Sequence, residues 1–306
     1  MLNEREIESC YLGQFIPVHY HHNMLMDRNR MQNFKAAIDY AVFPGAKVLE
    51  LGGGTGVLSW FAAQKAEKVW CVEFNPDMVQ EAKRLLPQNR HGHKVEVVHA
   101  DAFEYLPPEP VDVVICEMIH VAMLREKQVE VIESFKQRYL AKFGGPLPRF
   151  LPEAVLMAAQ PLQQGYEFEG YFAPIIQFQE TGVLATQTLE MADPVVYSLL
   201  DFTETCDMHI QWAGQFEIAH AGNINAIRFI TKNILAVVKE NSSTIDWLNH
   251  YMVMPLAHPI RAEVSDIVDL SFQYRCGGSL PSLQASMRAH VSYAQEQRYG
   301  RQKAYA

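Results

Sequence analysis

The sequence predicts a doubly wound α/β fold in the first half of the chain and a mainly β second domain. Between residues 46 and 117, short apolar runs alternate with helical segments. These runs are continuous rather than alternately apolar and polar, which is typical of parallel strands that helices cover on both faces. After residue 150, strand-like runs separated by turn residues replace the helical segments. This change of pattern predicts two domains.

Four strands and two helices are expected in the first half. The strand runs are KVLEL, KVWCVEF, KVEVVHAD and VDVVICE, and the helical segments are VLSWFAAQKA and NPDMVQEAKRLL. Since a helix between two strands returns the chain to the same sheet, this order predicts parallel βαβ units. The carboxyl ends of such strands meet at one edge of the sheet, where open α/β folds bind their ligands.

The second domain is predicted to begin near residue 150. The stretch AKFGGPLPRFLP carries two glycines and three prolines, which end the preceding helix. The runs AVLMAAQPL, FEIAHAGNINAIRFI, ILAVV and VDLSFQYRC then have the composition of strands. We therefore assign residues 1–150 to the first domain and residues 151–306 to the second.

Composition indicates a globular cytoplasmic protein. The chain has 306 residues, 49% of them apolar, and no apolar run approaches the length of a membrane span. Its five cysteines are widely spaced, without a CxxC pair. The histidines at 19, 21 and 22 have no cysteine or carboxylate at ligand spacing, so we expect no bound metal. A net charge of −9 disfavours nucleic-acid phosphates and is compatible with a cationic substrate.

A glycine-rich loop follows the first predicted strand. In VLELGGGTGVLSW, Glu50 precedes Gly52, Gly54 and Gly56 between a strand and a helix. Glycines at this place let a ligand approach the peptide groups of a helix N-terminus. The dinucleotide fingerprint needs a third small residue, but that position is Val57. An acid followed by GxGxG instead resembles the cofactor loop of S-adenosylmethionine-dependent methyltransferases.

Two further acids end the next two predicted strands. Glu73 ends the second run, where a carboxylate can accept hydrogen bonds from both ribose hydroxyls. Asp101 ends the third run, where it can accept one from the adenine amino group. The alternative is that Glu50, Glu73 and Asp101 are ordinary polar residues at strand ends and the glycines form only a turn. Their position at successive strand ends favours a bound S-adenosyl-L-methionine.

A pair of glutamates brackets an apolar stretch after the fourth strand. In CEMIHVAMLRE, Glu117 and Glu126 are nine residues apart, so one continuous helix would place them on opposite sides. A shared site therefore requires a bend between them. With one acid at a strand end and the other nine residues on, the stretch resembles the double-glutamate loop of the protein arginine methyltransferases.

The N-terminal segment strengthens this resemblance. YLGQFIPVHYHHNMLMDRNR aligns without gaps to the corresponding family segment through Tyr11, Phe15, Met24, Asp27 and Arg30. The resemblance implies that Arg30 binds the cofactor carboxylate, that His21 lies on the cofactor side and that Met24 is an active-site methionine.

The resemblance continues into the second domain. GGPLPRFLPEAVLMAAQ resembles the family's passage from a Rossmann-like methyltransferase domain into a β-barrel-like domain, and STIDWLNHYM resembles its Thr-His-Trp loop, with Trp247 as the tryptophan. Residues 163–200 have the length of the family's dimerisation arm. The resemblance therefore implies a homodimer.

Several residues depart from the family pattern. Met118, Ile119, His120 and Val121 stand where the family has Trp-Met-Gly-Tyr, and Gln128 replaces a second active-site methionine. Phe15 replaces a tyrosine. Asp246 replaces the family histidine that pairs with the aspartate at Asp27, so two carboxylates there are expected to repel each other or to share a proton.

The sequence thus predicts a methyltransferase that uses S-adenosyl-L-methionine and methylates a guanidine nitrogen. Glu117 and Glu126 would clamp the acceptor, which could be a protein, a peptide or a small molecule carrying a guanidine. Two alternatives are a methyltransferase of the same fold that acts on a small molecule or a biosynthetic intermediate, and a non-catalytic binding module that keeps the cofactor fold. We expect no nucleic-acid or membrane partner.

Overall fold

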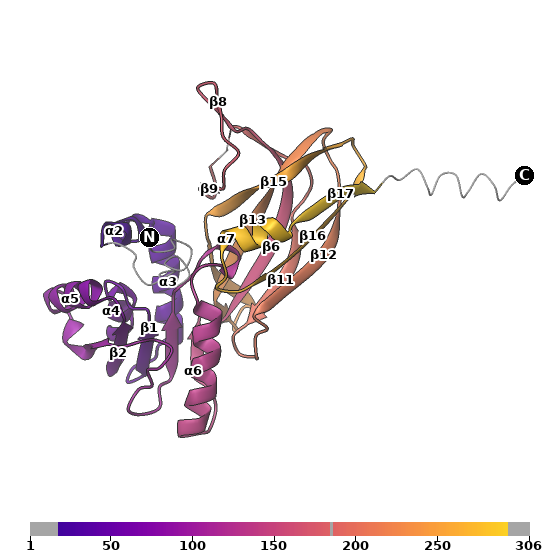
Figure 1. Cartoon of the computed structure of the whole chain (residues 1–306). Coiled ribbons are helices and arrows are strands. Elements are labelled where there is room, and N and C mark those ends of the chain that lie inside the picture. The colour runs from indigo at the N-terminus through magenta and orange to yellow at the C-terminus, as the bar shows by residue number, and fades with distance from the viewer. Residues whose placement is uncertain (1–17, 184–185, 293–306) are drawn as a thin grey trace, which may run out of the picture.

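The computed structural model describes residues 18–183 and 186–292. Figure 1 shows two parts side by side, an α/β part that contains the N-terminal half and a β-rich part that contains the C-terminal half. The chain passes from the sheet of the first part to the sheet of the second between Leu151 and Ala154.

The first part is built on a parallel sheet of five strands. Their order is β3-β2-β1-β4-β5, and every neighbouring pair is parallel. The strands are β1 (Lys47–Leu51), β2 (Lys68–Glu73), β3 (Val95–His99), β4 (Val113–Cys116) and β5 (Arg149–Leu151). Each of the four predicted runs forms a strand. The chain reverses its direction of travel across the sheet between β1 and β4, which creates a crevice at their carboxyl ends.

Helices cover both faces of this sheet. Successive strand residues point to opposite sides, and because both sets are apolar, each face must be buried. Val48 and Val113 pack in one core cluster with Phe34, whereas Leu49 and Val114 pack in the other. The helices are α2 (Val18–Met26), α3 (Arg28–Ala41), α4 (Val57–Ala63), α5 (Pro76–Leu85) and α6 (Gln128–Phe143), with short 3-10 turns η1 (Leu86–Gln88), η2 (Gly92–Lys94) and η3 (Val121–Met123). Within the described residues, no helix is long and apolar enough to cross a membrane.

The second part is mainly antiparallel β structure. One sheet has the order β10-β6-β13-β15-β9, with β11 on β6 and β14 on β13, and a second has the order β12-β16-β17. The elements are β6 (Ala154–Gln164), β9 (Gln177–Gln179), β10 (Thr188–Glu190), β11 (Val195–Asp201), β12 (His209–Glu217), β13 (Gly222–Val238), β14 (Ser243–Leu248), β15 (Tyr251–Ala262), β16 (Ile267–Arg275), α7 (Leu280–Ser286) and β17 (Arg288–Ser292). Closure of these sheets into a barrel stays a prediction.

A hairpin projects from the second part. It consists of β7 (Glu167–Phe168) and β8 (Tyr171–Phe172), and Figure 1 shows it standing clear of both sheets. The hairpin and its neighbouring residues expose Tyr171, Phe172 and Ile175. This segment falls within residues 163–200, where the sequence predicts an arm.

One hydrophobic cluster joins the two parts. It runs from β1 and α6 of the first part to β13 and β16 of the second, and it includes the fully buried side chains of Met123 and Leu124. The loop between Glu117 and Glu126 is therefore packed into the joint between the two parts.

Candidate active site

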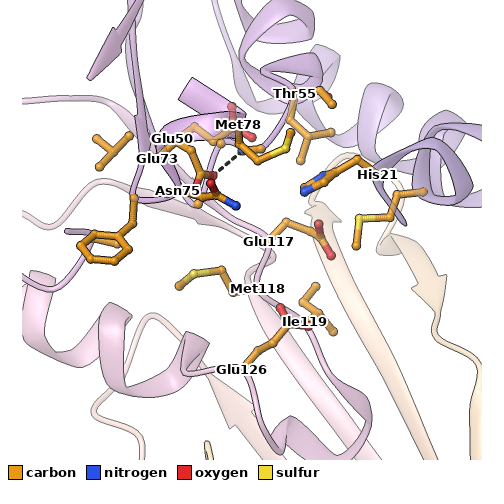
Figure 2. Close-up of a pocket in the computed structure, with 18 of the residues that line it drawn as sticks. His21, Glu50, Thr55, Glu73, Asn75, Met78, Glu117, Met118, Ile119 and Glu126 are labelled. Carbon is orange, nitrogen blue, oxygen red and sulfur yellow. Dashed lines mark hydrogen bonds between the residues drawn. The ribbon is translucent and has the colours of Figure 1, made fainter. Parts of the chain in front are cut away.

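A cavity opens at the carboxyl ends of the parallel strands, where the sheet changes direction. It contains about 1230 Å³ of empty space, open solvent at its mouth included. Its lining includes all but one of the residues that the sequence singled out, namely His21, Met24, Arg30, Glu50, Gly52, Gly54, Glu73, Asp101, Glu117 and Glu126. Gly56 is the exception, because it lies at the start of α4 and packs against Leu86. Figure 2 shows His21, Glu73, Glu117 and Glu126 around this space.

The glycine loop forms one wall of the cavity in a conformation that favours glycine. Gly52 has φ +78° and Gly54 has φ +53°, both in the left-handed region. A Cβ on Gly54 would lie 2.9 Å from Cε1 of His21, and one on Gly52 would lie 2.8 Å from Cγ of Met118. The left-handed backbone therefore favours glycine at both positions, and a Cβ at either one would also displace the side chain of His21 or Met118. The same burial that brings His21 against the loop lowers the pKa of its imidazole.

Backbone donors orient Glu73 and Asp101. Glu73 accepts hydrogen bonds from the Gly54 N–H at 2.8 Å and from the Asn75 N–H at 2.7 Å, one on each oxygen. Asp101 accepts one from the Phe103 N–H at 2.9 Å. Because each carboxylate oxygen has two lone pairs, both acids keep capacity for hydroxyl or amino donors of a ligand.

Glu50 is the most deeply buried acid of the cavity. One of its oxygens accepts hydrogen bonds from the N–H and the hydroxyl of Ser59. Burial, only partly offset by these two bonds, raises the pKa of Glu50 to about 8. Glu50 therefore ties the glycine loop to α4 and adds little fixed charge at neutral pH.

Arg30 crosses the cavity to the first glutamate of the pair. Its guanidinium donates a hydrogen bond to Glu117 and forms an ion pair with it. Arg30 is buried, with its guanidinium carbon 5.5 Å from the ring centre of Phe34 and 6.0 Å from that of Trp247. The Arg30 cation therefore lies in the wall of the cavity, where it neutralises Glu117.

Glu126 faces the same cavity without a cation of its own. Among the described residues, no hydrogen bond or ion pair reaches its carboxylate. Burial, followed by repulsion from Glu117, raises the pKa of Glu126 to about 8. The site thus holds two acids. Glu117 is paired with the Arg30 guanidinium, whereas the Glu126 carboxylate has no such pair among the described residues.

The stretch between the two glutamates turns back as the sequence predicts. It leaves β4, passes through η3 and reaches α6, which begins at Gln128. Met118 and Ile119 line the cavity and give it an apolar wall where the family has other side chains. His120 donates from Nδ1 to the Val121 carbonyl at 2.9 Å, and its ring meets the Phe178 ring edge-on at 5.7 Å between centres.

Gln128 closes this loop, which its sequence position alone did not reveal. Its side-chain oxygen accepts a hydrogen bond from the Met118 N–H at 3.0 Å. Met118, which follows Glu117, is thus bonded to Gln128, which lies two residues after Glu126. Sequence reasoning recognised Gln128 only as a replaced methionine. It also missed Asn75, which lines the cavity and caps α5, although a polar residue two positions after β2 and directly before a proline was a usable signal.

Asp246 and Asp27 have different bonding partners in the structure, and the repulsion expected between them stays a prediction. Asp246 lies on β14 and forms an ion pair of 2.7 Å with Lys232 of β13. Asp27 instead caps α3, where it accepts a hydrogen bond from the Arg30 N–H at 2.9 Å. Each acid therefore bonds to a donor of its own, although Oδ1 of Asp246 is buried without a hydrogen-bond partner among the described residues. Tyr11 and Phe15 lie outside the described residues.

Together, the fold and the cavity define a class of protein. An open parallel sheet carries a glycine loop and strand-end acids at its switch point, which is the arrangement of enzymes that bind an adenosine-containing cofactor. In the described residues, no group of three or more histidine, cysteine, aspartate or glutamate side chains could hold a metal ion.

Comparison with known proteins narrows this class. Residues 48–142 match the family model described as a methyltransferase domain. An uncharacterised protein of Methanocaldococcus jannaschii is 27% identical over 88% of this chain and 96% of its own length. Protein arginine N-methyltransferase 10 of Arabidopsis thaliana is 34% identical, over 47% of this chain and 39% of its own length.

Solved structures support the same fold. The structure of Arabidopsis thaliana protein arginine methyltransferase 10 matches with a TM-score of 0.70 at 19% identity, covering 86% of this chain and 89% of that one. A Trypanosoma brucei protein arginine methyltransferase 1 enzyme–prozyme complex matches with a TM-score of 0.66 at 15% identity, covering 89% and 96%. The predicted fold class is thereby confirmed.

Residues 48–142 therefore carry a methyltransferase domain, and the chain resembles the protein arginine methyltransferases in sequence and in fold. The methyltransferase domain identifies the protein as an enzyme, with S-adenosyl-L-methionine as its cofactor. This identification sets aside the non-catalytic binding module that the sequence left open.

Proposed function

We propose that this methyltransferase transfers its methyl group to a guanidine nitrogen, as in the arginine side chain of a protein or peptide. The observation that carries the proposal is the pair of glutamates from opposite ends of one loop, both facing the cavity of the glycine loop. Within residues 18–183 and 186–292, no cation bonds to Glu126, and a guanidinium can supply one with five N–H donors in a fixed fork. The name of the Arabidopsis relative agrees with this acceptor.

The cofactor site in this proposal uses residues already oriented by the fold. Gly52 and Gly54 would let the cofactor approach the loop backbone, with Gly56 starting the helix behind it, and Glu50 holding the loop. Arg30 would bind the cofactor carboxylate, Glu73 the ribose hydroxyls and Asp101 the adenine amino group. His21 and Met24 would contact the cofactor from the same cavity. The bound cofactor supplies an electrophilic methyl group on a positively charged sulfur.

The two glutamates would activate the acceptor electrostatically. A guanidinium has a pKa above about 12 and delocalised lone pairs, which make it a poor nucleophile. Hydrogen bonds from its fork to Glu117 and Glu126 would orient it and draw its positive charge toward the carboxylates, leaving the remaining nitrogen free to attack. A carboxylate or water would accept the proton that is lost.

A small guanidine compound or another nitrogen nucleophile is the second candidate for the acceptor. The apolar wall formed by Met118 and Ile119 favours it, because these residues replace the family's loop residues beside Glu117. The relative matched over nearly its whole length has no named activity that would decide between these acceptors.

We further propose that the chain works as a homodimer through the projecting hairpin. Tyr171, Phe172 and Ile175 are more than half exposed, at 73%, 61% and 62%, and lie close together in sequence. A cluster of this kind marks a surface that a partner covers. The heterotetrameric complex named for the Trypanosoma brucei protein agrees with assembly in this family.

Two measurements test the proposed function. Calorimetric titration with S-adenosylhomocysteine should show binding, and labelled cofactor should mark guanidines, arginine peptides or proteins of a cell extract. In the variant Glu117→Gln, methyl transfer should fall about a hundredfold or more, since the clamp loses a charge, while S-adenosylhomocysteine affinity changes little.

The matched control is Glu104→Gln, which removes an exposed carboxylate of the same part. It should leave transfer and cofactor affinity unchanged. Label found only on oxygen, carbon or carboxylates would sink the nitrogen assignment, and transfer that persists in Glu117→Gln would sink the clamp.

A further inference from the structure

The loop between the two glutamates has an unusual backbone. Ala122, Met123 and Arg125 have φ angles of 58°, 52° and 57°, in the left-handed region that side chains other than glycine rarely adopt. Such conformations persist only where the surroundings impose them, and they gather at functional sites. The structure must therefore contain the contacts that hold these three residues.

Those contacts come from the second part of the molecule. The Ala122 N–H donates to the hydroxyl oxygen of Thr231 at 2.7 Å. The Gly277 N–H donates to the Met123 carbonyl at 2.8 Å, and the Arg125 N–H donates to the Gly278 carbonyl at 2.8 Å. Each left-handed residue is thus held by a hydrogen bond from outside the loop.

Of the three bonding partners, Thr231 is the one that uses its side chain, and it lies within the paired strand β13. It is fully buried on β13, opposite Met157 of β6, and its carbonyl accepts the Asn249 N–H at 3.1 Å. Without the Thr231 hydroxyl, the Ala122 N–H would be buried without a partner, because Ala122 is itself fully buried. The left-handed conformation of Ala122 would then be destabilised, and the loop would be expected to change its conformation.

We propose that Thr231 is a positioning residue, which fixes the double-glutamate loop so that Glu117 and Glu126 face one cavity. Thr231 does not line the cavity and acts through Ala122. The second part of the molecule therefore sets the geometry of the clamp. The inference rests on the clamp role proposed above for the two glutamates.

The test compares Thr231→Val, which keeps the shape and removes the hydroxyl, with Thr231→Ser, which keeps the hydroxyl. The readout that needs no acceptor is the titration midpoint of Glu126, followed by carbon NMR of labelled glutamate and assigned with Glu126→Gln. Glu117, Arg125 and Arg30 are the charges that act on this carboxylate. In Thr231→Val the midpoint should fall from about 8 toward that of an ordinary glutamate, and in Thr231→Ser it should stay.

Methyl transfer supplies the second readout. Thr231→Val should lower kcat/KM for the acceptor about tenfold or more, with unchanged S-adenosylhomocysteine affinity, as expected for a lost buried hydrogen bond. The double variant Thr231→Val, Ala122→Gly should recover part of this loss, because glycine adopts the left-handed conformation without help. Thr188→Val is the control, since it removes a bonded hydroxyl of β10 and should leave the Glu126 midpoint unchanged.

The outcomes separate this inference from the proposed function. A wild-type midpoint and wild-type transfer in Thr231→Val would overturn the positioning role, as would a double variant no better than the single one. Failure of the wild-type protein to bind S-adenosylhomocysteine would instead remove the proposed function, and the Glu126 midpoints would still decide whether Thr231 sets the loop.

Discussion

At the scale of single residues, the two glutamates proposed to clamp the acceptor lie in different electrostatic surroundings. Glu117 is beside Arg30, whereas Glu126 has no bonded cation in the described part of the chain, and burial raises its pKa to about 8. At neutral pH Glu126 is therefore mainly protonated until a cation binds. A guanidinium acceptor would lower that pKa and release a proton on binding.

This difference predicts the pH dependence of methyl transfer. Because the ionised form of Glu126 grows as pH rises, kcat/KM for the acceptor should increase up to about pH 8 and then level, since kcat/KM reports the free enzyme. Glu126→Gln should be slow and lack this rise. The measurement is a pH–rate profile between pH 6 and pH 9.5, and Glu104→Gln should keep the wild-type shape. A wild-type profile that is flat across pH 8 would contradict the role of Glu126.

Single residues also show where sequence reasoning stops. Glu73, Asp101 and Glu117 could be predicted because each directly follows an apolar run, and a strand end has one place in a parallel sheet. The partners Lys232 of Asp246 and Thr231 of Ala122 could not, because both depend on which strands and loops meet in three dimensions. No spacing in the sequence carries that information.

At the scale of elements, the start of α3 connects stability with the cofactor site. Asp27 caps this helix by accepting a hydrogen bond from the N–H of Arg30, the residue whose side chain reaches Glu117. A capping side chain satisfies a donor that the helix itself leaves unpaired. The cap therefore also fixes the backbone from which Arg30 extends.

Asp27→Ala should cost about 1 kcal/mol of unfolding free energy and should also weaken S-adenosylhomocysteine binding, whereas Asp27→Asn should preserve both. Urea unfolding and calorimetry measure the two effects. Ser279→Ala removes the cap of α7, away from the cavity, and should lower stability without changing cofactor affinity. If Asp27→Ala lowers stability alone, the cap does not position Arg30.

The elements of the first part were predictable for a physical reason. Continuous apolar runs such as those of β1 and β4 are buried on both faces, and burial of this kind leaves a direct trace in composition. The conformation of residues 121–125 left no such trace. Its left-handed residues are not glycines, and their cause lies in hydrogen bonds from β13 and from Gly277 and Gly278.

At the scale of the whole molecule, the projecting hairpin is the surface that we propose as the dimer contact. Its aromatic residues lie on an element with few neighbours of its own, so folding does not bury them (Figure 1). Exposure of an aromatic cluster to water is unfavourable in free energy, and contact with a second surface would remove that exposure. A second copy of the chain offers such a surface with closed symmetry.

This argument predicts the oligomeric state and its dependence on two side chains. The wild-type chain should sediment as a dimer at micromolar concentration, and the double variant Tyr171→Glu, Phe172→Glu should sediment as a monomer with an unchanged circular-dichroism spectrum. Val264→Glu is the matched control, because Val264 is 58% exposed at a distance in sequence from the hairpin, and it should remain dimeric. A double variant that stays dimeric would show that another surface holds the two copies together, since two carboxylates cannot be buried there without a cation.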